Sequence, residues 1–187
     1  MRASKKINAL LVAGALVGVP ASMYAAADAN AAADANSQNT LQEQVRHALV
    51  MIPYYNVFDN LSFRVDNGAV TLFGQVTDPV VKTDAENSVK NIEGVSGVND
   101  QIEVLPLSPN DNRIRWMTYR SIYGFPALQR YALGVVPSIH IIVKNGHVTL
   151  TGVVATQQDR EMAYLRANNV PGVFSVTNDL RVEASQS

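Results

Sequence analysis

The sequence contains no cysteine, so disulfide bonds, cysteine nucleophiles and cysteine metal ligands are all excluded. Histidine is scarce, with His47, His140 and His147 as its three positions. In the strand pattern described below, His140 and His147 lie about 13 Å apart at about 3.4 Å per residue. Zinc ligands must lie about 2 Å from one centre. We therefore predict no metal site.

Signatures of catalysis are missing as well. The serines occur in none of the settings typical of a nucleophile. The glycines lie at predicted turns and helix ends rather than in a strand-to-helix Gly-x-Gly-x-x-Gly phosphate loop. Acidic side chains such as Asp66 and Asp100 fit an ordinary solvated face. We predict no catalytic residue, no cofactor and no enzymatic activity.

The apolar run at residues 7–19 is too short to span a hydrocarbon core of about 30 Å as a helix. It follows the basic residues Arg2, Lys5 and Lys6 and precedes small residues, as in a signal peptide. We expect residues 1–27 to be removed, with Ala25-Ala26-Ala27 as the cleavage site. Residues 28–38, rich in alanine, aspartate and asparagine, are predicted to form a flexible tether. The mature protein should be periplasmic or secreted, with no transmembrane segment.

What the sequence does contain is a duplication. Residues 61–104 align without a gap to residues 139–182, and 14 of the 44 positions are identical. The offset of 78 residues indicates two copies of one small domain rather than a solenoid of short repeats. Four of the positions kept in both copies, eight residues in all, are predicted to serve turns or the core: Asn67, Gly68, Gly74, Gly94, Asn145, Gly146, Gly152 and Gly172.

The elements of one copy follow from local patterns. Thr40 to Glu43 is typical of a capping box that opens a helix, and Pro53 ends that helix. Apolar residues then alternate on two strands joined by Asn67-Gly68, a pair that suits a two-residue type I′ turn. Asp78-Pro79 starts a second amphipathic helix. Glycines end this second helix, and a last strand follows them.

This order predicts an α+β fold of two tandem helix–strand–strand–helix–strand domains. Each has a three-stranded mixed sheet with two helices on one face, because the strand–helix–strand passage requires a right-handed parallel crossover. We place the domains at residues 39–106 and 107–184, called the first and second copy below. The second hairpin turn is Asn145-Gly146, and the second helix of this copy starts at Thr156. The joint at residues 106–109 is short, so we expect the copies to touch.

Residues 65–74 (Val-Asp-Asn-Gly-Ala-Val-Thr-Leu-Phe-Gly) and residues 92–100 (Ile-Glu-Gly-Val-Ser-Gly-Val-Asn-Asp) resemble the BON domain. Residues 143–152 and 170–180 resemble it again. The resemblance implies an exported or envelope-associated, non-enzymatic module, for which binding to phospholipid surfaces is the usual proposal. The sequence departs from the pattern at residues 113–137, which are rich in arginine and aromatic residues and are interrupted by prolines.

Charge divides unequally between the copies. Residues 37–105 carry 4 basic and 9 acidic side chains, whereas residues 106–187 carry 8 and 5. No acid lies between Asn112 and Gln158. Helical spacing predicts that Trp116, Tyr119 and Tyr123 belong to the core, with Ile114 and Met117 pointing outward. The alternative of evenly scattered charge stays open, but we expect five basic residues to face an anionic surface: Arg113, Arg115, Arg120, Arg130 and Lys144.

The sequence therefore favours a non-catalytic exported binding module at the cell envelope. Its partner would be an anionic phospholipid surface, contacted through the basic second copy. The alternative is a periplasmic stress or chaperone-like protein that shields envelope proteins. We expect no nucleic-acid partner, and the sequence leaves the oligomeric state open.

Overall fold

The computed structural model describes residues 21–134 and 136–183. The chain divides into two compact units, Met1–Ser37 and Gln38–Ser187, and both BON-like copies lie in the second. Helix α1 spans Ala21–Val50. Among the described residues, no helix is long and apolar enough to cross a membrane.

Helix α1 corrects two sequence predictions. Residues 28–38 are helical rather than irregular, because alanine has the highest helix propensity and dominates this segment. Thr40 therefore lies inside a helix and does not begin one. The basic and apolar parts of the predicted leader lie outside the described residues. The expected cleavage site, Ala25-Ala26-Ala27, falls within α1.

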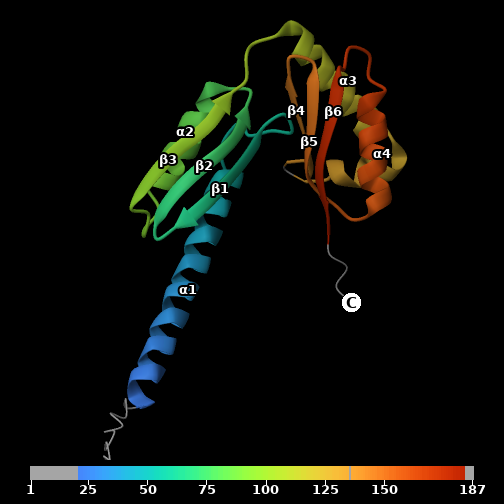
Figure 1. The fold of residues 1–187 in the computed structure, drawn as a ribbon. Coiled ribbons are helices and arrows are strands. Elements are labelled where there is room, and N and C mark those ends of the chain that lie inside the picture. Colours follow the sequence, from blue (N-terminus) through green and yellow to red (C-terminus); the bar gives the residue numbers. More distant parts are fainter. Residues whose placement is uncertain (1–20, 135, 184–187) are drawn as a thin grey trace, which may run out of the picture. The chain divides into compact units, whose positions relative to one another are not determined.

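The first copy has the predicted α+β topology. Strands β1 (Asn60–Asp66) and β2 (Ala69–Val76) pair antiparallel, and β3 (Gly97–Val104) pairs parallel to β2. Helix α2 (Pro79–Lys90) forms the crossover, with Asp78 as its N-cap and a proline in its first turn. Figure 1 shows this sheet with its helices. One core joins α1, α2 and the sheet, including Val45, Leu72, Val81 and Ile102, so both helices pack on the same face.

The second copy repeats this topology after a longer connection. Helix α3 (Pro109–Tyr123) and the short 3₁₀ helix η1 (Pro126–Ala132) precede strands β4 (Ile139–Lys144) and β5 (His147–Val154). Helix α4 (Gln157–Asn168) crosses to β6 (Ser175–Val182), which is parallel to β5. Thr156 caps α4 by accepting a hydrogen bond from the Asp159 amide. The prediction of two tandem three-stranded mixed sheets is confirmed.

The eight kept asparagines and glycines predicted to serve turns or the core share an unusual backbone conformation. All eight have positive φ, including the turn pairs Asn67-Gly68 (50° and 81°) and Asn145-Gly146 (53° and 79°). Gly94 and Gly172 follow the crossover helices at φ of 90° and 92°. Positive φ strains residues with a side chain, and glycine adopts it readily. Backbone conformation thus accounts for the glycines that the duplication retains.

The buried face of α3 differs from the prediction. Ile114, Thr118 and Ile122 are fully buried, whereas Trp116 is 56% exposed. These three positions correspond to Leu41, Val45 and Leu49 of α1 at an offset of 73 residues, not 78. The insertion that contains η1 shifts the helix by five residues against the strands. The predicted outward position of Ile114 and core position of Trp116 are therefore wrong.

Candidate functional site

The five basic residues predicted to form one anionic-surface contact have three different environments. Arg113 and Arg120 are exposed on α3. Arg130 and Lys144 are about half exposed, and each forms an ion pair. Arg115 is only 4% exposed. The structure therefore removes Arg115 from any surface contact, and it does not gather the other four into one cluster of unpaired charges.

Arg115 is held inside the second copy by the β4–β5 hairpin. Its Nη2 donates to the Val143 carbonyl at 2.7 Å and its Nη1 to Asn112 Oδ1 at 2.5 Å. Burial lowers the pKa of Arg115, and the carboxylates of Asp111 and Asp59 oppose that shift. The prediction that Arg115 contacts a ligand at the surface is wrong, because this guanidinium contributes to the fold.

Asp111, which the sequence did not single out, acts on the same hairpin. Its carboxylate accepts hydrogen bonds from the amides of Asn145 (2.9 Å) and Gly146 (2.8 Å), and its side chain is buried. Because the turn needs positive φ, both amides point toward one acceptor. A buried aspartate at the start of α3 thus fixes the turn, and only the three-dimensional position of the turn could reveal it.

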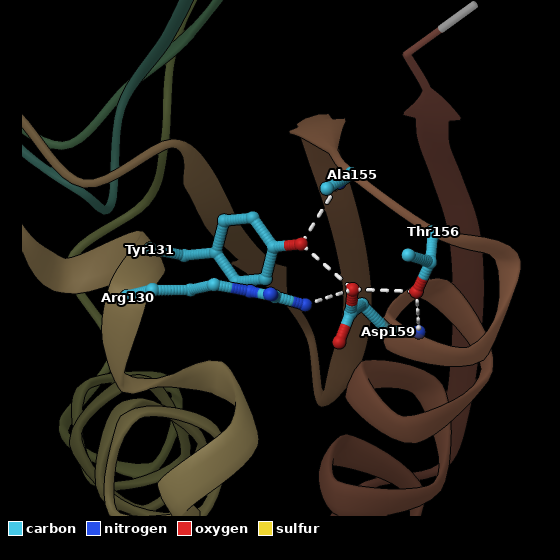
Figure 2. A network of polar contacts seen from close by, with 5 residues as sticks. All are labelled: Arg130, Tyr131, Ala155, Thr156 and Asp159. Carbon is cyan, nitrogen blue, oxygen red and sulfur yellow. Dashed lines mark hydrogen bonds and ion pairs between the residues drawn. The ribbon is translucent and has the colours of Figure 1, made fainter. Parts of the chain in front are cut away.

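Arg130 belongs to a polar network that joins η1 to α4 (Figure 2). The Asp159 carboxylate accepts from Arg130 (2.5 Å), the Tyr131 hydroxyl (2.9 Å) and Thr156 Oγ1 (2.6 Å). The Tyr131 hydroxyl in turn accepts from the Ala155 amide. Burial raises the pKa of Asp159, but the hydrogen bonds from Thr156 and Tyr131 and the Arg130 charge outweigh it and lower the pKa. Since every carboxylate contact here comes from the chain itself, the network stabilises the fold.

Lys144 forms an ion pair with Glu103 at 2.5 Å, which links the end of β4 to β3 of the first copy. Both side chains are more than two-fifths exposed, so the pair contributes little to stability. Glu103 nonetheless partly neutralises the charge of Lys144. Lys144 is therefore a weaker candidate for a ligand contact than the arginines of α3.

The outward face of α3 combines charge with exposed apolar surface. Arg113, Trp116, Met117 and Arg120 recur at helical spacings of three and four, and so lie on one side of the helix. Trp116 contacts Phe58 edge-to-face at 5.0 Å and remains 56% exposed. The Arg113 side chain donates to Asn110, and within the described part of the chain the Arg120 side chain has no hydrogen bond or ion pair. We call these four residues the α3 face.

No group of three or more histidine, aspartate or glutamate side chains is arranged to hold a metal ion within residues 21–134 and 136–183. His140 is half buried against Tyr55, with ring centroids 5.7 Å apart. Burial lowers the pKa of His140, although the backbone and carboxylate of Asp59 oppose this. Among the features above, the α3 face is the one suited to an external partner.

Comparisons with known proteins agree with the repeat. A family model described as the BON domain matches residues 37–106 and 132–184. The chain is 29% identical to osmotically-inducible protein Y of Escherichia coli (strain K12), in an alignment that covers 66% of this chain and 62% of the relative. The chain thus spans less than two thirds of that relative's length.

Two solved structures of CdsD, a structural protein of the type III secretion system of Chlamydia trachomatis, also match. The first is of its C-terminal domain. Each match has 13% sequence identity and a TM-score of 0.27. The alignments cover 76% and 79% of this chain, and 96% and 94% of the matched chains. A TM-score this low gives no basis for transferring a function.

Proposed function

Because the chain belongs to the BON-domain family, we propose that it is an exported, stress-related binding protein of the cell envelope that attaches to anionic phospholipid surfaces. Membership in this family and the similarity to an osmotically-inducible protein support the stress-related part. The proposed location is the periplasm, reached through the predicted signal peptide. No catalytic step is part of the proposal.

One observation carries the lipid-binding part: the composition of the α3 face. Two exposed arginines flank a tryptophan and a methionine on one side of a helix. Basic side chains attract anionic headgroups, while tryptophan prefers the boundary between headgroups and acyl chains. Trp116 and Met117 thereby replace Arg115 in the contact predicted from the sequence. The proposed contact is smaller than the predicted one and more amphipathic.

The expected strength of this contact is modest. A basic residue near an anionic membrane contributes about 1 kcal/mol. The two arginines would therefore account for about a thirtyfold change in affinity. Because surface attraction is screened over about 8 Å at physiological ionic strength, added salt should weaken the binding in the same way as removal of the arginines.

Vesicle sedimentation tests the proposal. The protein should sediment with vesicles rich in phosphatidylglycerol and remain in solution with phosphatidylcholine vesicles. Arg113→Gln with Arg120→Gln should abolish most of this binding at unchanged thermal stability. The matched control is Arg160→Gln with Arg166→Gln on α4, judged at a temperature where that variant is folded. Equal sedimentation of the α3 variant and the parent would contradict the proposal.

The second candidate, shielding of envelope proteins under stress, is favoured by the similarity to the osmotically-inducible relative. It requires exposed apolar surface but no positive charge. Suppression of the aggregation of an unfolded test protein should then survive both high salt and the removal of Arg113 and Arg120. Lipid binding through the α3 face should survive neither.

A further inference from the structure

The two copies differ in whether the backbone groups along one edge of the sheet have hydrogen-bond partners. β1 and β4 occupy equivalent edges of the two sheets, opposite the edges formed by β3 and β6. In a two-residue hairpin the residues beside the turn exchange hydrogen bonds, so alternate residues further back direct their backbone groups to the open edge. By the register of the two hairpins, these residues are Leu61, Phe63 and Val65 in β1, and Ile139, Ile141 and Val143 in β4.

The β4 edge is closed by the chain itself. The Tyr123 hydroxyl donates to the Ile139 carbonyl at 2.5 Å. The Ile141 amide donates to the carbonyl of Val57 at 2.8 Å. Arg115 donates to the Val143 carbonyl, as described above. Each of the three β4 residues whose backbone groups point to the open edge therefore has a hydrogen-bond partner.

The β1 edge is open over the equivalent residues. At the start of this edge, the Tyr55 hydroxyl interacts with the backbone of Leu61. For Phe63 and Val65, the described part of the chain offers no backbone partner beyond the sheet. An edge strand with unpaired amides and carbonyls is a template for another extended chain.

A groove of about 470 Å³ follows this open edge and concentrates positive charge there. It is lined by residues 61–65 together with Gln42, Arg46 and Arg181. Three exposed arginines therefore face it (Arg46, Arg64 and Arg181), and no carboxylate is among its lining residues. Arg46 and Arg64 are the two arginines of residues 37–105, a segment with 9 acidic side chains. Both therefore lie beside β1 in an otherwise acidic copy, with the Arg64 guanidinium carbon 5.9 Å from the centre of the Phe73 ring.

We infer that the β1 edge binds an extended acidic segment of another protein by strand addition. Phe63 and Val65 supply the backbone donors and acceptors. Arg46, on the helix side of the sheet, and Arg64, on the opposite side, receive carboxylates from both faces of the added strand, and Arg181 adds a third positive charge beside it. The pair of Arg46 with Glu43, 3.9 Å apart and highly exposed, is weak enough to be exchanged. Two copies of this chain would bring like charges together, so the charge favours a different, acidic partner.

The test uses a fluorescent nine-residue peptide of three Glu-Glu-Val repeats, which places glutamates on both faces of an added strand. It is titrated into the whole protein and followed by anisotropy. We expect saturable binding, and protection of the Phe63 and Val65 amides from hydrogen exchange at saturation. Arg46→Gln, Arg64→Gln and Arg181→Gln together should lower the affinity about tenfold at unchanged thermal stability, because all three side chains are exposed. A peptide with lysine in place of glutamate should not bind.

Two further peptides separate strand addition from simple charge attraction. Each is N-methylated on one alternate set of residues, so that only one of them removes the amides that face β1. We expect one to lose binding and the other to keep it. Equal binding of both, unprotected Phe63 and Val65 amides, or dimerisation of the protein through this edge would overturn the inference.

The groove is also separable from the α3 face. Arg113→Gln with Arg120→Gln should leave peptide binding unchanged, and the triple groove variant should still sediment with anionic vesicles. Loss of vesicle binding in the groove variant without loss of peptide binding would assign the groove to lipid and contradict strand addition. Failure of the lipid proposal alone would leave the peptide result intact.

Discussion

At the scale of single residues, the two glycines in the middle of β2 and β5 have a different role from the one predicted. Because they lie within strands, the sequence assigns Gly74 and Gly152 to the core, beneath a helix. Their φ angles are 127° and 119°, and an added Cβ would collide with the backbone carbonyl of the neighbouring strand, at Asn60 and Ser138. The constraint is therefore the backbone of the hairpin, and a helix that moves aside would not relieve it.

Gly152→Val should lower the free energy of unfolding by about 2–4 kcal/mol, from strain at positive φ together with the clash. Chemical denaturation measures this change. Gly97→Ala is the matched control, because Gly97 has no atom within 4 Å of the added carbon and φ outside the left-handed region. It should change stability by less than about 0.5 kcal/mol. Similar denaturation midpoints for both variants would contradict this explanation.

The Asp159 network makes a prediction about acid stability. The pKa of Asp159 lies below its usual 3.8, so its stabilising contribution is present above that pH and is lost as pH falls through the lower, folded value. Asp159→Asn should therefore be less stable than the parent at pH 7. From pH 6 to pH 3 the parent should lose more stability, and the two curves should converge. Urea titrations at several pH values measure this, and parallel curves would exclude the network.

At the scale of elements, the sequence predicted what local chemistry determines. The Asn-Gly turns and the helix caps at Asp78 and Thr156 depend on residues within a few positions, and the strand order follows from the crossover rule. The start of α1 was missed because a favourable cap at Thr40 competes with an alanine-rich segment before it that continues the helix.

The face of α3 could not be predicted by transferring the offset of 78 residues. The offset holds for the strands, but η1 lies between α3 and β4 and changes the register of the helix to 73. A shift of five residues rotates a helix by about 140°, which moved Trp116 outward and Arg115 inward.

Arg115 and Arg113 should consequently respond in opposite ways. Arg115→Gln should destabilise the second copy by about 1–3 kcal/mol, because it leaves the buried Val143 carbonyl without its donor. Arg113→Gln should change stability by less than about 0.5 kcal/mol and weaken vesicle binding instead. Thermal unfolding and sedimentation of the two variants check this. A destabilised Arg113 variant beside a stable Arg115 variant would reverse the assignment.

At the scale of the whole molecule, the first copy completes the core of the second. Val57 and Phe58, which precede β1, are buried in the cluster that contains Ile114, Ile141 and Leu150. Asp59 fixes their segment by accepting hydrogen bonds from the amide and hydroxyl of Thr77 (2.7 and 2.8 Å). No pattern within residues 53–59 distinguishes a loop that packs on its own domain from one that packs on the next, so the sequence could not predict this.

Phe58→Ala should therefore destabilise the second copy although the substitution lies in the first. We expect a loss of about 3 kcal/mol, typical of a buried phenylalanine truncated to alanine. The emission of Trp116, which contacts Phe58, should report the transition. Leu107→Ala, at a connecting residue that is 93% exposed, is the control. An unchanged transition for the Phe58 variant would show that the copies fold independently.

The most direct test of the account is the fluorescence of Trp116 on vesicles, because it is the single tryptophan of the chain and lies at the centre of the α3 face. With phosphatidylglycerol vesicles its emission should shift to the blue and be quenched by brominated acyl chains. Phosphatidylcholine vesicles, high salt and the Arg113→Gln/Arg120→Gln variant should each suppress the change. Sedimentation with anionic vesicles while Trp116 keeps its solvent-exposed emission would contradict lipid binding through this face.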